Sequence, residues 1–413
     1  MVQESLNDIQ NLKVSIIVPA YNAAQKIAFC LDSLFNLDFP AEEREIIVVD
    51  NNSTDETKEI VSPYPVKYVF ESKRTRGAAR NKGISVAKGK YIAFTDSDCI
   101  VDKNWLKILF EAVESDDNIA ACGGKIVAHK TDNIFERFAE ERDMLSQKLA
   151  MDSDVNQEIP RVVTANAIFR KDVLEEIGLF DEDLITSEDT ELGWRLSFGG
   201  YQMKYIPESL VYHLHIRDFK NFFLHQFEYG CASHLVFRKY RYILGPDVSK
   251  TKYFLTRIRA LWRLTINAFR ILQINKGKEK AHLFIENIVQ LFFVFGQICM
   301  SLKPIKLSNR LDIRRVAPKE IYIKYNGFDL KLNSGVVWFL NNDSLRIFNL
   351  KDDLFYRLNE TAAEIWQRLI DGQNLSDAIN GISEEYESGP EAIREDVIDF
   401  INQLRQENIL IAA

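Results

Sequence analysis

The chain has 413 residues, of which 46% are hydrophobic and 27% charged, and its net charge is −8. This length allows two or three globular domains, and the negative charge argues against nucleic acid as the main partner. The five cysteines are odd in number and lack C-x-x-C spacing, which favours free thiols in a reducing cytoplasm over disulfides or a zinc site. The polar, mixed-charge start predicts no signal peptide.

Predicted strands and helices alternate along the first hundred residues. Apolar, β-branched runs that suit buried strands occur at 14–18, 45–49, 66–70 and 91–95. With helical patterns between them, these runs predict an α/β fold with a largely parallel sheet. Ligands bind such sheets beyond the carboxyl ends of the strands, where Tyr21, Asp50 and Asp96 stand. No G-x-G-x-x-G or G-K-[ST] follows a strand, so neither a dinucleotide fingerprint nor a P-loop is indicated.

The segment Asp96-Ser97-Asp98 follows the fourth predicted strand. Because side chains alternate faces along a strand, the two aspartates point the same way. Paired carboxylates suit a divalent cation, since hard cations take oxygen ligands. An acidic turn with no metal is the alternative reading of an isolated D-x-D. Earlier in the chain, residues 53–56 fit a capping box, which predicts a helix start there.

Five motifs resemble those of family 2 glycosyltransferases, which have the GT-A fold. They lie at 14–22 (VSIIVPAYN), 48–56 (VVDNNSTDE), 76–83 (RGAARNKG), 89–98 (GKYIAFTDSD) and 186–196 (TSEDTELGWRL). The resemblance covers about residues 12–230 and implies a Rossmann-like domain that binds a nucleotide-diphospho-sugar.

The resemblance also implies roles for individual residues. The nucleotide-sugar site would contain Pro19, Ala20, Tyr21, Asp50, Arg76, Asp96, Ser97 and Asn166. Asp98, with Asp96, would hold Mn2+ or Mg2+, which offsets the charge that develops on a diphosphate leaving group. His213 and His215 are candidate metal ligands, with a structural role as the alternative. Arg80 is expected to tie its helix to the sheet.

A candidate general base follows in the pair Glu188-Asp189. An inverting transfer needs a base on the acceptor, and the resemblance points to Asp189. Adjacent carboxylates repel each other, which raises one pKa and suits that role. The same residues fit a helix N-terminus, and the two roles are compatible. The Gln-x-x-Arg-Trp signature of processive synthases is replaced by residues 225–230 (HQFEYG), which favours one or a few transfers.

Two helices are predicted after this domain, at 253–273 and 283–302. The first is basic and amphipathic, which is typical of helices that lie at an anionic membrane surface. In the second, the uncharged stretch 287–302 is shorter than the roughly 20 residues needed to span a bilayer. Packing on the catalytic domain or on a partner chain is the alternative for both helices.

The C-terminal part predicts a small winged-helix-like α+β domain after a basic linker at 304–318. Short strands are followed by three helical patterns. Residues 354–366 (LFYRLNETAAEIW), 371–372 and 396–404 resemble PqqD-like peptide-recognition domains. The resemblance implies that a leader peptide binds as an added strand at a sheet edge. A structural or oligomerisation module is the alternative.

Together, these observations predict three regions: a GT-A catalytic domain at 1–235, basic amphipathic helices at 236–310 and a PqqD-like domain at 311–413. The predicted function is an inverting, metal-dependent transfer of a sugar from a nucleotide diphosphate, a UDP-sugar being the first candidate. The acceptor is a peptide bound by the C-terminal domain or, alternatively, a lipid-linked or cell-surface glycan. A non-catalytic scaffold on a transferase fold is the remaining alternative. The predicted location is the cytoplasm, including the inner face of the cell membrane.

Overall fold

The computed structural model describes most of the chain. The described residues are 12–151, 159–244, 250–272, 277–302, 322–325, 328–333, 336–341, 344–349, 354–358, 360–370, 373–385 and 390–412. The predicted linker at 304–318 and the motif residues Asn359, Asp371 and Gly372 lie outside them. The chain divides into two compact units, which we call the N-terminal and the C-terminal unit. The N-terminal unit holds 12–151, 160–193 and 202–302 of the described residues.

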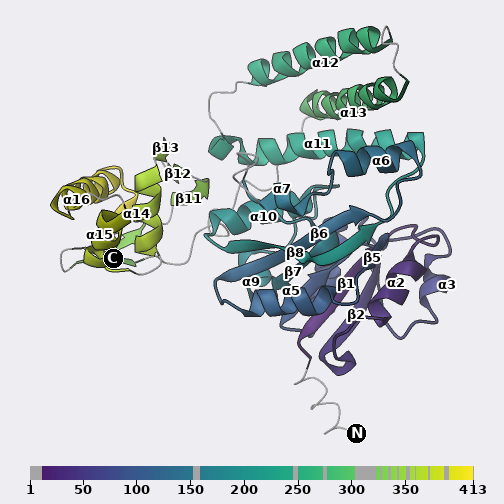
Figure 1. Ribbon diagram of the computed structural model, residues 1–413, viewed down its shortest axis with the longest axis horizontal. Coiled ribbons are helices and arrows are strands. Elements are labelled where there is room, and N and C mark those ends of the chain that lie inside the picture. Colours follow the sequence, from purple (N-terminus) through teal and green to yellow (C-terminus); the bar gives the residue numbers. More distant parts are fainter. Residues whose placement is uncertain are drawn as a thin grey trace. The chain divides into compact units, whose positions relative to one another are not determined.

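An eight-stranded mixed sheet forms the centre of the N-terminal unit, in the order β3-β2-β1-β4-β7-β6-β8-β5 (Figure 1). The strands are β1 (Val14–Ala20), β2 (Arg44–Asp50), β3 (Lys67–Phe70), β4 (Tyr91–Phe94), β5 (Cys99–Val101), β6 (Ile119–Ala128), β7 (Ala167–Arg170) and β8 (Gln202–His213). The first four are parallel to one another, as the sequence predicts. β7 is antiparallel to both β4 and β6, and β5 is antiparallel to β8. The sheet therefore combines a parallel half with a mixed half.

Burial explains the position of the parallel half. Every residue of β4 is buried, and β1 is buried except for Pro19, as expected for strands covered on both faces. The helices of this unit before residue 200 are α2 (Ile27–Phe35), η1 (Ala41–Glu43), α3 (Thr57–Val61), α4 (Arg76–Val86), α5 (Trp105–Glu114), α6 (Ile134–Glu141), α7 (Gln147–Met151), η2 (Thr164–Asn166), α9 (Lys171–Ile177) and the start of α10 (Glu188–Phe198). Helix α4 approaches β1 closely because it has a glycine there: a Cβ on Gly83 would lie 2.5 Å from Ile17.

Three long helices pack on one another beside the sheet (Figure 1). They are α11 (Phe219–Leu244), α12 (Lys250–Leu272) and α13 (Gly277–Leu302), and α13 packs against both α11 and α12. Two glycines set the α11–α13 crossing. A Cβ on Gly230 would lie 1.9 Å from the Phe293 carbonyl oxygen, and a Cβ on Gly296 would lie 2.2 Å from that of Phe227. Helix α11 runs without a break across residue 235, the predicted domain boundary.

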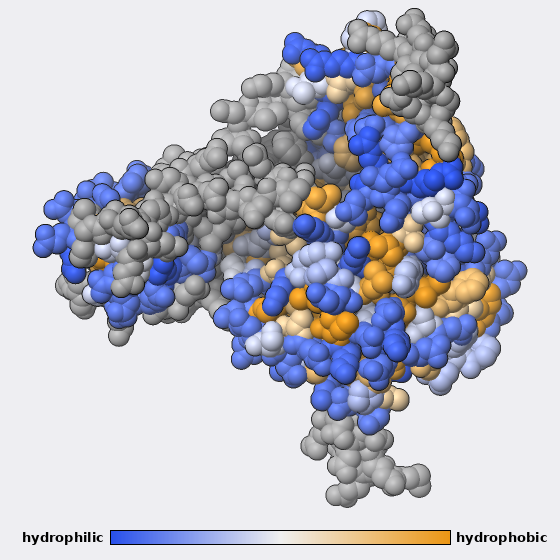
Figure 2. Space-filling model, viewed as in Figure 1, coloured by the Kyte–Doolittle hydropathy of each residue, from blue (hydrophilic) through white to orange (hydrophobic). Residues whose placement is uncertain are grey.

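One stretch within the described residues, His282–Ser301 of α13, is long and apolar enough to cross a membrane by length and composition. It is longer than the predicted uncharged stretch because it includes Glu286. Of this stretch, 39% is buried inside the protein, and a core helix can meet the same criteria. The face of the molecule in Figure 2 shows separate hydrophobic patches among hydrophilic residues.

The described residues of the C-terminal unit after 311 form two small sheets and three helices. One sheet has the order β14-β10-β9 and the other β11-β12-β13. The strands are β9 (Tyr322–Tyr325), β10 (Phe328–Leu332), β11 (Val336–Asn341), β12 (Ser344–Asn349), β13 (Leu354–Leu358) and β14 (Leu410–Ala412). The helices are α14 (Glu360–Ile370), α15 (Leu375–Glu385) and α16 (Pro390–Gln406). Trp338 of β11 and Trp366 of α14 meet edge to face in its core, with ring centroids 5.7 Å apart.

Candidate functional site

A cavity of about 370 Å³ opens at the carboxyl ends of β1 and β4. Side chains from strand ends, loops and helices of the N-terminal unit line it. Most residues predicted to form the site are among them: Pro19, Ala20, Tyr21, Arg76, Asp96, Ser97, Asp98, Glu188, Asp189, His213 and His215. The parallel register explains this convergence, because Ala20 lies beside Asp50 and Ile17 beside Phe94, so the strands end at one edge.

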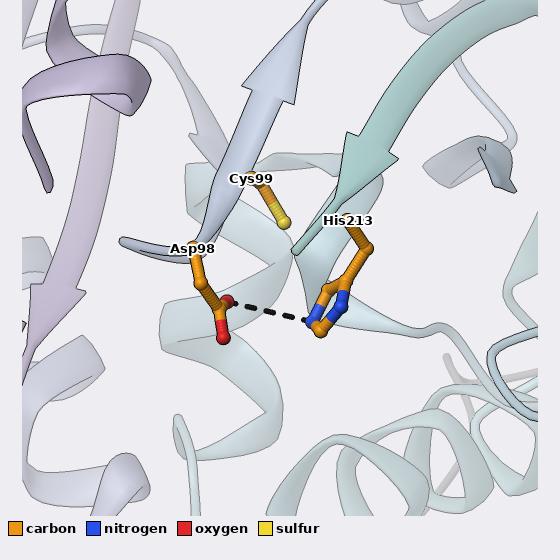
Figure 3. A group of neighbouring side chains, drawn as sticks. All are labelled: Asp98, Cys99 and His213. Atoms are coloured by element: carbon orange, nitrogen blue, oxygen red, sulfur yellow. Dashed lines mark ion pairs between the residues drawn. The ribbon is translucent and has the colours of Figure 1, made fainter. Parts of the chain in front are cut away.

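The D-x-D segment forms the turn between β4 and β5, which brings a histidine to it. β5 pairs with β8 so that Cys99 lies beside His213, and the Leu214 amide donates to the Asp98 carbonyl (2.8 Å). Nε2 of His213 lies 3.4 Å from Oδ1 of Asp98 (Figure 3). Burial would raise the pKa of Asp98, but the charges of His213 and Lys26 outweigh it and hold that pKa below its ordinary value.

These groups fit a divalent cation. Ligand atoms of Asp98, Cys99 and His213 all lie within 4.8 Å of one another (Figure 3). Burial raises the pKa of the Cys99 thiol well above its ordinary value. The Asp98 carboxylate supplies the oxygen donors that Mg2+ and Mn2+ prefer, and the His213 imidazole adds a nitrogen donor. The buried Nδ1 of His213 has no hydrogen-bond partner in the described structure. The His215 ring lies 4.6 Å from that of His213, and burial lowers its pKa to about 4, so it is neutral at pH 7.

A buried arginine joins the D-x-D segment to the Glu188-Asp189 pair. Arg80, on α4, donates to Oδ1 of Asp96 (3.0 Å) and makes an ion pair with Glu188. Both Arg80 and Glu188 are 2% exposed. Burial and the neighbouring Asp189 charge raise the pKa of Glu188 despite the arginine. Arg80 thus ties elements together, as predicted, but it also lines the cavity and links two sets of site carboxylates.

Asp189 lines the cavity as Glu188 does, but it is only half-buried. It stands in the first turn of α10, where its Oδ1 accepts from the Thr190 amide (2.7 Å). The residue before the helix, Ser187, has a φ of 64°, which is unusual for a residue other than glycine. After this turn the Glu188 side chain is buried and that of Asp189 is partly exposed, and both residues line the cavity.

Arg76 forms a second cationic group in the cavity. Its guanidinium donates to Oγ1 of Thr186 (2.7 Å) and to Nε2 of His225 on α11 (2.9 Å). An arginine cannot accept a hydrogen bond, so Nε2 of His225 is the acceptor and the imidazole is neutral. Burial and the Arg76 charge lower the pKa of His225 to about 3, which agrees with this tautomer. Gln226 and Tyr229 of the same helix also line the cavity.

Two predicted residues do not line the cavity. Asp50 is 4% exposed, and its carboxylate accepts from the Ser53 amide (2.9 Å) and from the Tyr68 hydroxyl. Its neighbour Asn51 reaches the cavity instead. Asn166 is fully buried and links Trp105 Nε1 (2.8 Å) to the carbonyls of Lys125 and Ser209. It lies in η2, directly before β7.

Sequence reasoning did not assign Lys26, Cys99, His225, Gln226 or Tyr229 to the site. Lys26 donates to Oδ2 of Asp98 (3.2 Å) and to the Leu214 carbonyl (2.8 Å). The sequence could have placed Arg80 at the site, because Arg76 and Arg80 are four residues apart and therefore share a helix face. No comparable signal marks Lys26 or His225, because each depends on contacts far away in the chain.

Comparison with known proteins gives matches to two families. Residues 15–178 match the model of glycosyl transferase family 2, and residues 334–410 match that of coenzyme PQQ synthesis protein D (PqqD). Glycosyltransferase AglE of Haloferax volcanii is 28% identical over 226 residues, which cover 52% of this chain and 71% of AglE. Poly-beta-1,6-N-acetyl-D-glucosamine synthase of Staphylococcus epidermidis is 26% identical over 211 residues, 49% of this chain and 50% of the synthase. The chain thus spans only about half the length of that synthase.

A solved structure, mannosyltransferase PcManGT from Pyrobaculum calidifontis in complex with GDP-Man and Mn2+, aligns with 69% of this chain and 87% of its own at 19% identity and a TM-score of 0.48. The two family matches agree with the α/β sheet of the N-terminal unit and the small α+β C-terminal unit. The chain is therefore a glycosyltransferase, with a family 2 domain at residues 15–178 and a PqqD domain at residues 334–410.

Proposed function

We propose that the chain transfers a sugar from a nucleotide-diphosphate donor with inversion, that it depends on Mn2+ or Mg2+, and that a UDP-sugar is its first candidate donor. The observation that carries this proposal is that carboxylates and guanidinium groups line the same cavity. Asp96 and Asp98 lie at the strand ends, Asp189 stands opposite in α10, and Arg76 and Arg80 supply positive charge between them. A diphosphate, a metal and an acceptor hydroxyl each have a counterpart in this set.

Donor binding follows from the strand ends. The pocket wall at Pro19, Ala20 and Tyr21 supports the nucleoside, and the Arg74 guanidinium lies 4.2 Å from the centre of the Tyr21 ring. Asp98, Asp96, His213 and His215 are the candidate metal ligands. A bound divalent ion neutralises charge on the departing diphosphate. Arg76 adds a positive charge that Thr186 and His225 hold in place.

Asp189 is the proposed general base. It takes the proton of the acceptor hydroxyl as the acceptor oxygen bonds to the anomeric carbon, and the nucleoside diphosphate leaves with the electron pair of the broken bond. Attack from the face opposite the leaving group inverts the configuration. Glu188 positions this base, since Arg80 holds Glu188 inside the protein beside it.

The test is hydrolysis of nucleotide-sugars by the full chain with and without Mn2+. Wild-type protein should hydrolyse one of the common donors with Mn2+ and lose this activity with EDTA, and Asp98→Ala should be inactive with the metal present. A matched control is Asp117→Ala, whose side chain is 97% exposed and is not part of the cavity lining. Absence of both hydrolysis and metal-dependent UDP binding for every common donor would favour the scaffold alternative.

We propose that the acceptor is a peptide bound by the C-terminal unit. Its sheet β11-β12-β13 supports this proposal, because β11 and β13 each pair with one neighbour among the described strands and so leave an edge for an added strand. A chain that ends before residue 311 should keep donor hydrolysis and lose binding of a peptide encoded beside its gene. Unchanged peptide binding by the shortened chain would remove this acceptor.

Helix α12 favours a second candidate, an acceptor glycan at the inner face of the cell membrane. Leu255, Ile258 and Trp262 are 47%, 39% and 68% exposed on one stripe of the helix, with the exposed Arg259 and Arg263 beside them. An apolar stripe flanked by arginines suits the interface of an anionic bilayer. The wild-type chain should sediment with phosphatidylglycerol vesicles and not with phosphatidylcholine vesicles, and Trp262→Ser should weaken this binding. Failure to sediment with anionic vesicles would exclude the membrane role of α12.

A further inference from the structure

Lys26 occupies a position that no sequence motif assigns to it. It is the N-cap residue of α2, at the end of the loop that follows β1. Its Nζ lies 2.8 Å from the Leu214 carbonyl oxygen and 3.2 Å from Oδ2 of Asp98. A carboxylate and a backbone carbonyl are both ligands that a divalent cation takes. The Lys26 ammonium group therefore lies between two oxygen atoms that could bind a divalent cation.

Both oxygens of the Asp98 carboxylate face a basic side chain. Oδ2 accepts from Lys26, while Oδ1 faces Nε2 of His213 at 3.4 Å. A divalent ion bound through Oδ2 at ordinary coordination distance would lie next to the ammonium group, and two neighbouring positive charges repel each other strongly in a half-buried site. The ion and the Lys26 ammonium group therefore compete for this oxygen, and each weakens the binding of the other.

The Lys26 side chain also has space into which it can move. Its side chain is 35% exposed. It borders a second cavity of about 770 Å³, whose lining includes Gln25, Lys130 and Asn221. A flexible four-carbon stem can move the ammonium group into this space without a change in the fold.

We propose that Lys26 is a tethered cation that closes the metal site of the donor-free enzyme, so that a divalent ion binds at Asp98 only by displacing its ammonium group. The inference rests on the proposed metal dependence and adds a positioning residue to it. Lys26 neutralises Asp98 when no metal is bound, and it lowers the affinity of the site for metal. The divalent ion therefore binds well only when a second ligand, the diphosphate of the donor, also holds it.

The test is a titration of the purified full chain with Mn2+ in the absence of nucleotide. Electron paramagnetic resonance measures the concentration of free Mn2+ at each step. Lys26→Met removes the charge and keeps the side-chain length, so it should bind Mn2+ at least about tenfold more tightly than wild type. Lys26→Arg retains the charge and should stay within about threefold of wild type, as should Lys130→Met, which removes an exposed charge from the neighbouring cavity. The rise of Tm with added Mn2+, measured on the same variants, is a second readout and reports whether each is folded.

Equal Mn2+ affinity of wild type and Lys26→Met would overturn the inference, as would equal tightening by Lys130→Met, which would indicate a general charge effect. The variant Asp98→Asn in the Lys26→Met background separates this failure from that of the proposed function. Loss of Mn2+ binding in that double variant supports the metal site at Asp98. Unchanged binding in it would remove the metal site itself and, with it, the role of Lys26.

Discussion

At the scale of single residues, the buried Arg80 guanidinium balances the charge of two carboxylates at the cavity. Arg80 contacts Asp96 and Glu188, and the last of these has a raised pKa because it is buried. Removal of one partner from such a pair leaves the other charge buried and uncompensated, which costs more than the pair itself contributes. The arginine is therefore required to keep the Glu188 carboxylate inside the protein, while Asp96 stays partly exposed at the cavity.

Arg80→Met should lower the free energy of unfolding of the N-terminal unit by about 3–5 kcal/mol, because it leaves Glu188 unpaired. Arg80→Met combined with Glu188→Gln should regain part of this loss. Urea unfolding measures both. Arg170→Met is the control, since its partners Asp117 and Asp172 are exposed and such pairs contribute less than about 1 kcal/mol. A double variant as unstable as the single one would show that the charge of Glu188 is not the cause.

Asp189→Asn should lower kcat by a factor of about 10²–10⁴, the usual contribution of a general base, and leave donor affinity unchanged. The reason is that Asp189 faces the cavity but lies in α10, away from the strand ends that are proposed to hold the nucleotide. Steady-state kinetics and UDP titration distinguish the two effects, with Asp117→Asn as the control. A parallel loss of UDP affinity would assign Asp189 to donor binding.

At the scale of elements, the contact between α11 and α13 depends on two glycines. Backbone carbonyl oxygens of the facing helix occupy the space that a Cβ on Gly230 or Gly296 would need. Close approach of this kind brings α11 into a fixed position, and α11 carries His225, Gln226 and Tyr229 of the cavity wall. The helix crossing is thereby part of what positions the site.

Gly230→Ala and Gly296→Ala should each destabilise the N-terminal unit by about 1–3 kcal/mol, since the helices must separate to admit a methyl group. Thermal unfolding measures the change. Gly381→Ala is a matched helical control: its new Cβ would meet the flexible end of Arg368, which can move, and alanine is the better helix former. An unchanged Tm for both α11–α13 variants would contradict a rigid crossing.

At the scale of the whole molecule, buried neutral histidines make stability depend on pH. Burial lowers the pKa of His215, His225 and His234 to about 4, about 3 and about 4, from an ordinary value of 6.5. A lowered folded-state pKa contributes stability above pH 6.5 that is lost as the pH falls, because the unfolded chain takes up the protons first. The free energy of unfolding should therefore fall as the pH drops from 6.5 towards 4.

Between pH 6.5 and pH 4, His225 alone should account for a loss on the order of 3 kcal/mol, at about 1.4 kcal/mol for each pKa unit. His225→Gln keeps a hydrogen-bond acceptor for Arg76 and cannot be protonated, so its unfolding free energy should fall less over this range. Urea unfolding at half-unit pH steps measures the difference. Parallel curves for the two proteins would show that His225 does not contribute.

The sequence predicts the parts of this molecule that local patterns determine. The parallel strands follow from continuous apolar runs, and the convergence of Tyr21, Asp96 and Asp98 follows from parallel register. The capping box at residues 53–56 was wrong: α3 begins at Thr57 and its N-cap, Glu56, makes no side-chain cap. Ser53 and Asp55 instead accept from the amides of Asn22 and Ala24. These side chains suit a helix cap by local sequence, but they hold the loop after β1 instead.

The remaining errors concern contacts between distant segments. Asn166 is adjacent to the site in sequence, but a Cβ on Gly124 would lie 2.5 Å from its amide, so the glycine of β6 lets Asn166 enter the core. Lys26 and Leu214 are 188 residues apart, and Arg76 and His225 are 149 apart. No periodicity or motif encodes such pairs, because the sheet order and the α11–α13 packing bring them together.

The course of α11 has a practical consequence for anyone who shortens this protein. The family 2 match ends at residue 178, but Asp189, His225 and Tyr229 come later in the chain. A fragment cut at the end of the match would keep the part of the cavity at the strand ends and lose the part that α10 and α11 form. Since α13 packs closely on α11, a fragment designed to keep this cavity should extend to Leu302 at the end of α13.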